Sequence, residues 1–225
     1  MIGGINKKNS SLALFVTKRL IVLAAGASGG GKTTIVDRLI AELGVGIKIP
    51  LDEFYHDQGP IDTNRAELDI RARVNYDHPS AIDFELANKL LAELYSGQTI
   101  NLPQYSFERH TRKPITLKVE PNKLIFVEGI FVLRDELKVP EAYRVFVQTD
   151  LAIACTRRLV RDVNERGRRL EQAAGQLERT VIPGYRRFVE PTRHDADYVL
   201  SWTGEVDGKF KDLCHIIRAR MNGEH

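Results

Sequence analysis

A glycine-rich loop that contains a lysine constrains this chain more than any other feature. The segment GASGGGKT, residues 26–33, follows the apolar run LIVLAA and precedes apolar residues at helical spacing. This order of strand, loop and helix is typical of phosphate-binding loops. Glycines allow a tight turn whose backbone N–H groups point at anionic oxygens, and the following helix adds its positive end. The sequence therefore predicts binding of a nucleoside triphosphate.

Two side chains of this loop have a specific chemistry. Lys32 can reach the β- and γ-phosphates, and the hydroxyl of Thr33 can ligate Mg²⁺. We therefore expect the triphosphate to bind together with Mg²⁺. The residues predicted to bind it are Gly26, Ala27, Ser28, Gly29, Gly30, Gly31, Lys32, Thr33 and Thr34.

The order of the predicted elements favours an α/β fold of the P-loop NTPase type, with an open parallel sheet flanked by helices. Short apolar runs of strand length alternate with segments of helical periodicity. The helix that follows HPSAIDF is expected to have Ser80 as its N-cap. The expected strands are residues 20–25, 46–51, 123–127, 143–147 and 198–201, and the expected helices are 33–43, 81–95, 151–166 and about 171–189.

One segment interrupts this alternation. Residues 99–102 and 115–119 read as two short extended runs around a polar middle, which predicts a β-hairpin insertion at about residues 98–120. We expect a single P-loop domain at residues 18–225, preceded by a flexible tail at residues 1–17. An arginine-rich lid is expected at about residues 158–180.

The composition excludes several classes of protein. Hydrophobic residues make up 43% and charged residues 28%, the balance of a soluble globular protein, and we see no apolar stretch of membrane-spanning length. The formal charge of +3 is too small to imply nucleic acid, so we expect neither a nucleic-acid nor a membrane partner. Cys155 and Cys214 have no metal-ligand spacing and suit a reducing cytoplasm.

Acidic residues follow the predicted strands. Asp52 comes just after one strand, Glu128 after another, and Asp150 near the end of a third. In an open parallel sheet, ligands bind beyond the carboxyl ends of the strands, where the phosphate loop also lies. A carboxylate there can hold the metal or accept a proton from an attacking hydroxyl. We therefore predict Asp52 as the base and Thr33, Asp52 and Glu128 as metal ligands.

The segment CTRRLVRDVNERGRRLEQ concentrates arginines. Arg158, Arg161, Glu165 and Arg168 are spaced by three or four residues, as on one face of a helix. Gly167 interrupts the helical pattern, which suits the hinge of a lid. Without further context, a solvated helix face is the more common interpretation of such a stretch.

These residues, taken together, make the chain resemble the uridine kinase (uridine–cytidine kinase) family of P-loop nucleoside kinases. The matching segments are GASGGGKTT, LDEFY, NYDHPSAIDF, LPQYSFERHTR, FVEGI, RRLVRDVNERGRRLEQ and VEPTRHDADYV, and they span residues 20–201. NYDHP and RDVNERGR are far more specific than the phosphate loop, which unrelated enzymes share. The resemblance implies transfer of the γ-phosphate of ATP or GTP to the 5′-hydroxyl of uridine or cytidine, by a homotetramer.

The resemblance also implies roles for individual residues. Asp52 would be the base facing the 5′-hydroxyl, and Asp77 would hold the ribose hydroxyls. The implied catalytic residues are Asp52, Lys32, Arg161 and Arg166, the two arginines being lid residues over the phosphates. The implied substrate-binding residues are Asp52, Tyr55, Tyr76, Asp77, Tyr105, Phe107, His110, Arg158, Arg168 and Gln176.

Other functions remain open on the residues alone. The acceptor could be that of a phosphoribulokinase, a pantothenate kinase or a nicotinamide riboside kinase, although NYDHP and QYSFERHTR argue against these. A non-catalytic nucleotide-binding module is expected to lack some of the acids or arginines, and none is missing. An RNA-binding protein ranks last because of the low net charge.

Overall fold

A five-stranded parallel sheet forms the centre of the computed structural model, which describes residues 19–59, 74–139, 141–202 and 206–224. The strand order is β2-β5-β1-β6-β7, and each of the four pairings is parallel. This confirms the predicted α/β fold. The strands are β1 (Leu20–Gly26), β2 (Ile47–Pro50), β5 (Leu124–Glu128), β6 (Tyr143–Gln148) and β7 (Tyr198–Ser201). The tail expected at residues 1–17 lies outside the described residues.

Strand β1 occupies the middle of the sheet because both of its faces are apolar. Ile21, Leu23 and Ala25 face one hydrophobic cluster, whereas Val22 and Ala24 face the other. Successive side chains of a strand point to opposite faces, so a continuous apolar run suits a strand that is covered on both sides. The carboxyl end of β1, where the phosphate loop begins, is thereby fixed in the core.

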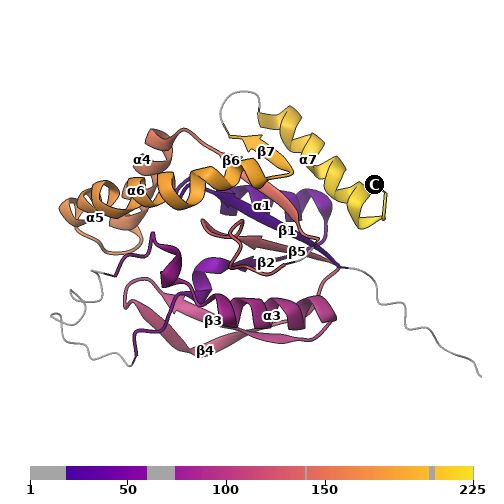
Figure 1. Cartoon of the computed structure of the whole chain (residues 1–225), viewed down its shortest axis with the longest axis horizontal. Helices are drawn as coiled ribbons and strands as arrows, with labels where there is room; N and C mark the ends of the chain where they lie inside the picture. Colours follow the sequence, from indigo (N-terminus) through magenta and orange to yellow (C-terminus); the bar gives the residue numbers. More distant parts are fainter. Residues whose placement is uncertain (1–18, 60–73, 140, 203–205, 225) are drawn as a thin grey trace, which may run out of the picture.

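Helices cover the two faces of the sheet (Figure 1). Helix α3 packs in the cluster of Ile21, and helices α1 and α7 pack in the cluster of Val22. Helix α7 is not among the helices predicted from the sequence. No helix of the described residues is long and apolar enough to cross a membrane. The helices are α1 (Lys32–Leu43), α3 (Phe84–Ser96), α4 (Leu151–Asn164), α5 (Leu170–Gln176), α6 (Ile182–Gly184) and α7 (Val206–Met221).

The predicted hairpin insertion is confirmed. Strands β3 (Ile100–Ser106) and β4 (Thr111–Val119) pair antiparallel in a sheet of their own, beneath α3 in Figure 1. The register shifts between Pro103 and Tyr105, which is a usual place for a proline because it has no N–H to donate to the ladder. The backbone N–H of Tyr105 donates to the carboxylate of Glu53, and this hydrogen bond ties the hairpin to the segment that follows β2.

The expectation that Ser80 caps α3 is wrong. The helix begins at Phe84, and the side chain of Asp83 accepts from the backbone N–H of Leu86 at 3.0 Å. Ser80 belongs to a short 3-10 helix, Pro79–Ala81, where His78 accepts from its backbone N–H. Both residues are good capping types, and Asp83 is the one placed directly before the continuous helix.

The segment expected to be one helix at about residues 171–189 is helical but irregular. After α5, two π-helical turns, Leu177–Val181 and Tyr185–Val189, flank the short α6, and a 3-10 helix, Glu190–Asp195, follows. Pro183 lies inside this run and has no N–H to donate, which is a common cause of such distortions. Helix α4 also ends earlier than expected, at Asn164, so Arg168 follows the helix instead of sharing its face.

Candidate functional site

The phosphate loop links the end of β1 to the start of α1. Gly29 has a φ of 77°, and a Cβ at this position would lie 2.3 Å from the carbonyl oxygen of Ala154. The position therefore requires glycine, both for its backbone conformation and for the close approach of α4. Gly30 donates its N–H to Ala27 at 2.9 Å, and Thr149 donates to the carbonyl of Gly30 at 2.7 Å. The loop thus has a defined shape that its own sequence and its neighbours impose.

Lys32 is buried at the first position of α1. Its Nζ donates to the carbonyl oxygen of Ala27 at 3.0 Å, so the side chain curls back over the loop. Burial lowers the pKa of Lys32, and the nearby carboxylates of Glu128 and Asp52 oppose this effect. An ammonium that is short of water gains strongly from an anionic ligand, which is the property expected of a phosphate-binding lysine.

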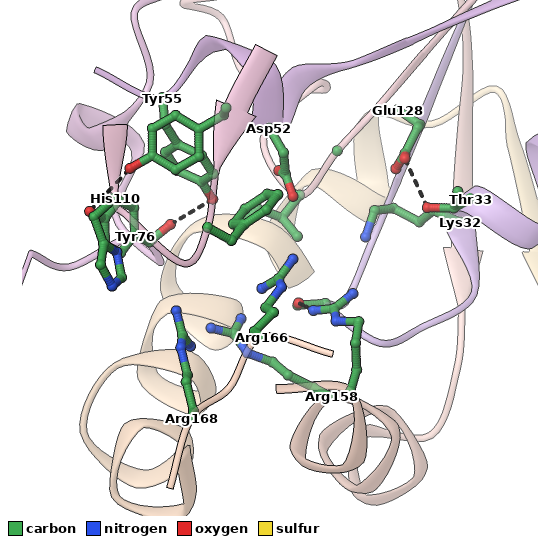
Figure 2. A pocket seen from close by; sticks show the side chains of 16 residues that line it. Lys32, Thr33, Asp52, Tyr55, Tyr76, His110, Glu128, Arg158, Arg166 and Arg168 are labelled. Atoms are coloured by element: carbon green, nitrogen blue, oxygen red, sulfur yellow. Dashed lines mark hydrogen bonds between the residues drawn. The ribbon is translucent and has the colours of Figure 1, made fainter. Parts of the chain in front are cut away.

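The predicted metal ligands lie at neighbouring strand ends. Thr33 donates its hydroxyl to Glu128 Oε1 at 2.8 Å, and Glu128 is buried at the end of β5. The register pairs Pro50 with Glu128, so Asp52, two residues beyond β2, comes to the same edge (Figure 2). Burial raises the pKa of Glu128, and the charge of Asp52 adds to this rise.

These three oxygen-bearing side chains fit a magnesium ion. Mg²⁺ prefers hard oxygen ligands and commonly binds through one or two carboxylates together with substrate phosphates. No group of three or more His, Cys, Asp or Glu side chains that could hold a metal alone occurs in the described part of the chain. A metal at this site would therefore need the oxygens of a bound phosphate as well as Thr33, Asp52 and Glu128.

A cavity brings the loop and the acids together with residues distant in the sequence. The inner cavity has a volume of about 60 Å³ and adjoins an outer cleft of about 950 Å³. The inner cavity is lined by Ser28, Lys32, Thr33, Asp52, Tyr55, Tyr76, Tyr105, Phe107, His110, Glu128, Gly129, Ile130, Arg158, Arg161, Arg166 and Arg168. Tyr76, Phe107, His110, Arg158, Arg166 and Arg168 also line the outer cleft, as do Asp77 and Gln176.

Aromatic side chains form one wall of the inner cavity. Tyr55 is buried and donates its hydroxyl to the backbone carbonyl of Tyr76 at 3.1 Å, and burial raises its pKa well above the usual value. The hydroxyl of Tyr105 lies 3.2 Å from that of Tyr76. The ring of His110 stacks on Tyr76 with centroids 5.3 Å apart, and Phe107 meets Tyr105 edge to face. This wall offers flat apolar faces with polar atoms at their rims.

Asp77 is buried beside this wall and is bound on its carboxylate. Arg158 donates to its two oxygens at 2.7 and 3.3 Å, and Thr180 donates to Oδ2 at 3.0 Å. Asp77 does not line the inner cavity, and it reaches the site through the outer cleft. Burial lowers the pKa of the Arg158 guanidinium, but the charges of Asp77 and Asp162 outweigh this effect and raise the pKa above its ordinary value.

The four predicted arginines all line the inner cavity, and Figure 2 shows Arg158, Arg166 and Arg168 extending into it from the side across from Tyr55 and Tyr76. Arg161 reaches the phosphate loop, where its Nη2 donates to Ser28 Oγ at 3.2 Å. Arg168 donates to Gln176 Oε1 at 2.6 Å, which places both predicted substrate residues together. Gly167 has a φ of 64° and provides the turn between α4 and α5 that brings Arg166 and Arg168 back to the site.

Some contacts lie outside the predicted site. Thr180 holds Asp77, and the buried Asp162 lies among the arginines. The spacing Arg158–Asp162–Arg166, four residues at each step, is the sequence signal that could have found Asp162. Asp150, the third strand-end acid, caps α4 by accepting from the N–H groups of Ala152 and Ile153.

The comparisons with known proteins agree with this geometry. A family model described as "Phosphoribulokinase / Uridine kinase family" matches residues 21–208. The chain belongs to that family. Among its relatives, a uridine kinase of Klebsiella pneumoniae is 41% identical over 211 residues, covering 90% of this chain and 94% of the relative. A uridine kinase of Erwinia tasmaniensis is 38% identical over the same shares of the two chains.

A likeness to a solved structure concerns the fold alone. The D-glycerate 3-kinase from Cryptococcus neoformans superposes with a TM-score of 0.56 at 18% identity, covering 78% of this chain and 80% of that one. The match shows that the two chains share a fold.

Proposed function

We propose that this protein is a pyrimidine ribonucleoside kinase, which transfers the γ-phosphate of ATP or GTP to the 5′-hydroxyl of uridine, cytidine or both. One observation carries the proposal. Lys32 of the phosphate loop and the carboxylate of Asp52 line the same cavity as the aromatic wall of Tyr55, Tyr76 and Tyr105. The relatives named uridine kinase, at 38–41% identity over most of the chain, support the same acceptor.

The donor binds with its phosphates in the loop. The ammonium of Lys32 and the loop N–H groups other than that of Gly30, which donates to Ala27, hold the β- and γ-phosphates, with the N-terminal end of α1 behind them. Thr33, Asp52 and Glu128 would hold Mg²⁺ against these phosphates. The metal, when bound, neutralises charge on the β- and γ-oxygens.

The acceptor binds between the aromatic wall and the arginines. The base and ribose would extend from the inner cavity into the outer cleft, because His110 lines both and Asp77 lines the cleft. A ribose hydroxyl would join or replace Thr180 on the carboxylate of Asp77. The imidazole of His110 can donate to a pyrimidine carbonyl or accept from an exocyclic amine, so it suits both uridine and cytidine.

Asp52 performs the proton transfer. It lines the inner cavity beside Lys32, so a 5′-hydroxyl in the cavity would face both the base and the γ-phosphate. As the hydroxyl oxygen attacks the γ-phosphorus, its proton passes to Asp52, and the bond between that phosphorus and the β–γ bridging oxygen breaks to release the nucleoside diphosphate. Arg161 and Arg166 then stabilise the charge on the transferring group, and the closed arrangement excludes water that would otherwise hydrolyse the donor.

A nucleoside panel tests the proposal. ADP release would be coupled to a spectroscopic readout, with ATP, Mg²⁺ and each of uridine, cytidine, adenosine and guanosine, and a reaction without acceptor would measure hydrolysis. We expect turnover with uridine or cytidine and little with the purine nucleosides. Turnover confined to ribulose 5-phosphate, pantothenate or nicotinamide riboside would instead assign another acceptor of the same chemistry.

The proposal also covers the compartment and the oligomeric state of the enzyme. Both cysteines are free, as expected for a reducing cytoplasm. We propose a homotetramer in this compartment. Size-exclusion chromatography with light scattering would test the assembly, and a monomeric mass at enzyme-assay concentrations would rule it out.

A further inference from the structure

Asp162 lies at the centre of the arginines that line the inner cavity. It is almost fully buried on α4, and its carboxylate lies within ion-pair distance of four guanidinium groups. Arg168 donates to it at 2.8 Å and Arg166 at 3.2 Å. The Nε atoms of Arg158 and Arg161 lie 3.5 and 3.8 Å from it. Each arginine of the inner cavity therefore shares this one carboxylate.

Asp162 itself lines neither the inner cavity nor the outer cleft. It also holds the chain after α4, because its backbone carbonyl accepts from the N–H of Arg168 at 3.0 Å. It therefore acts on the site from behind the guanidinium groups and touches no reacting atom in this arrangement. Its influence on a reaction would pass through the positions of the arginines.

The charges of the arginines and of their paired carboxylates do not cancel. Asp77 and Asp162 are the carboxylates paired with Arg158, Arg161, Arg166 and Arg168, so two guanidinium charges are in excess. Within the described residues, the Nε–H groups of Arg158 and Arg161 have no hydrogen-bond partner. These Nε–H groups are buried and lie toward Asp162, so it is the excess of positive charge that remains for an anion, while Asp162 limits how strongly the cluster attracts one.

We propose that Asp162 is the positioning residue of the arginine cluster, which sets the guanidinium groups for the transferring phosphoryl group and moderates their hold on bound phosphate. This inference rests on the proposed phosphoryl transfer. If Asp162 has this role, its loss should lower kcat and at the same time raise the affinity for phosphate anions. Loss of the Asp162 charge misplaces the arginines and lowers kcat, but it also raises the positive charge of the site and strengthens the binding of phosphate anions.

The test compares Asp162→Asn with wild type. Turnover would be measured with the nucleoside that the wild-type enzyme uses, and the Kd of inorganic triphosphate would be measured by calorimetry without acceptor at fixed ionic strength. We expect kcat to fall about 10- to 100-fold. We expect triphosphate to bind about threefold or more tightly. Unchanged kcat, or weaker triphosphate binding, would overturn the proposal.

Two further variants separate positioning from damage to the fold. Asp162→Glu keeps the charge but lengthens the side chain, so we expect wild-type triphosphate affinity and a kcat lowered at least about threefold. If Asp162→Asn does not fold, wild-type kcat in Asp162→Glu overturns the proposal. Glu171→Gln removes an exposed carboxylate from the same segment and should change neither quantity.

The two proposals can fail separately. A wild-type enzyme that phosphorylates no nucleoside in the panel would remove the proposed acceptor. The triphosphate measurement would still decide whether Asp162 moderates anion binding, because it needs no acceptor.

Discussion

The guanidinium carbon of Arg166 lies 3.9 Å from the centroid of the Phe107 ring. Arg166 also donates to Asp162 at 3.2 Å, so one side chain joins the β3–β4 hairpin to the arginine cluster. The hairpin and the segment after α4 are far apart in the sequence, and each provides one side of the inner cavity. The contact therefore closes the inner cavity between these two sides.

Removal of the Phe107 ring should loosen this closure. In Phe107→Leu we expect kcat to fall about three- to tenfold, because a partly desolvated cation–π contact is worth about 1 kcal/mol. Hydrolysis of ATP without acceptor should rise as water enters. The coupled assay with and without nucleoside measures both quantities. A variant with unchanged transfer and unchanged hydrolysis would show that the contact has no part in closure.

Asp52→Asn should remove the base and keep the fold. We expect kcat to fall about 100-fold or more, because the amide cannot accept the proton, while the Kd of ATP measured without Mg²⁺ changes little. Single-turnover kinetics and calorimetry measure the two effects. Asp135→Asn, at an exposed position, is the control for the loss of one carboxylate. Retained catalysis in Asp52→Asn would exclude Asp52 as the base.

Asp77→Ala should weaken nucleoside binding about 10-fold or more, because it removes the proposed partner of the ribose hydroxyls. It also leaves Arg158 buried without its main counter-ion, so thermal unfolding should occur at a lower temperature. Thr180→Val separates the loss of nucleoside binding from the loss of stability. It removes one hydrogen bond to Asp77 but keeps the ion pair of Asp77 with Arg158. An unchanged nucleoside Kd in Asp77→Ala would exclude the ribose role.

Glu128→Gln should stabilise the nucleotide-free protein in a pH-dependent way. Burial raises the pKa of Glu128 above 4.5, the ordinary value for glutamate, so between 4.5 and the raised pKa the folded state binds more protons than the unfolded state. Stability contributed by the protonated group is therefore present below about pH 4.5 and is lost as pH rises through the raised value. We expect Glu128→Gln to melt at a higher temperature than wild type at neutral pH.

The difference in melting temperature between Glu128→Gln and wild type should shrink as the pH falls, because wild-type Glu128 then becomes neutral too. Calorimetric melting curves across the pH range would measure it, with Glu171→Gln as the exposed control. A difference that is constant across pH would show that the burial of charge is not its cause.

Trp202, the single tryptophan of the chain, offers a direct signal of donor binding. A Cβ on Gly31 of the phosphate loop would lie 3.0 Å from its indole Nε1. We expect a saturable change in tryptophan emission as ATP or inorganic triphosphate fills the loop, because the added charge alters the field at the indole. Lys32→Met should abolish the change at the same concentrations. Emission that stays constant at saturating ATP would mean that the phosphates bind elsewhere.

Local patterns account for the parts of the fold that were predictable. The apolar run before Gly26 can only be a buried strand next to a loop of glycines, and the acids at Asp52 and Glu128 follow their strands directly. Parallel pairing then brings these strand ends to one edge, as the register of Pro50 with Glu128 confirms. A prediction of this kind needs no knowledge of distant contacts.

Features that depend on distant contacts were not predictable in the same way. The start of α3 at Asp83 depends partly on Arg112 of β4, which donates to the carboxylate of Asp83 at 3.0 Å. Helix-like charge spacing suggested one arginine face, but the turn at Gly167 brings Arg166 and Arg168 back onto Asp162. A buried carboxylate among arginines looks, in sequence, like any charged residue of a solvated helix.

In the part of the chain that the structure describes, the hairpin carrying Tyr105, Phe107 and His110 shares no strand pairing with the parallel sheet. Substitutions there can accumulate without disturbing the registry that aligns Lys32 with Asp52. The aromatic residues of the hairpin and the residues that would bind the donor therefore belong to separate parts of the fold that meet only at the cavity.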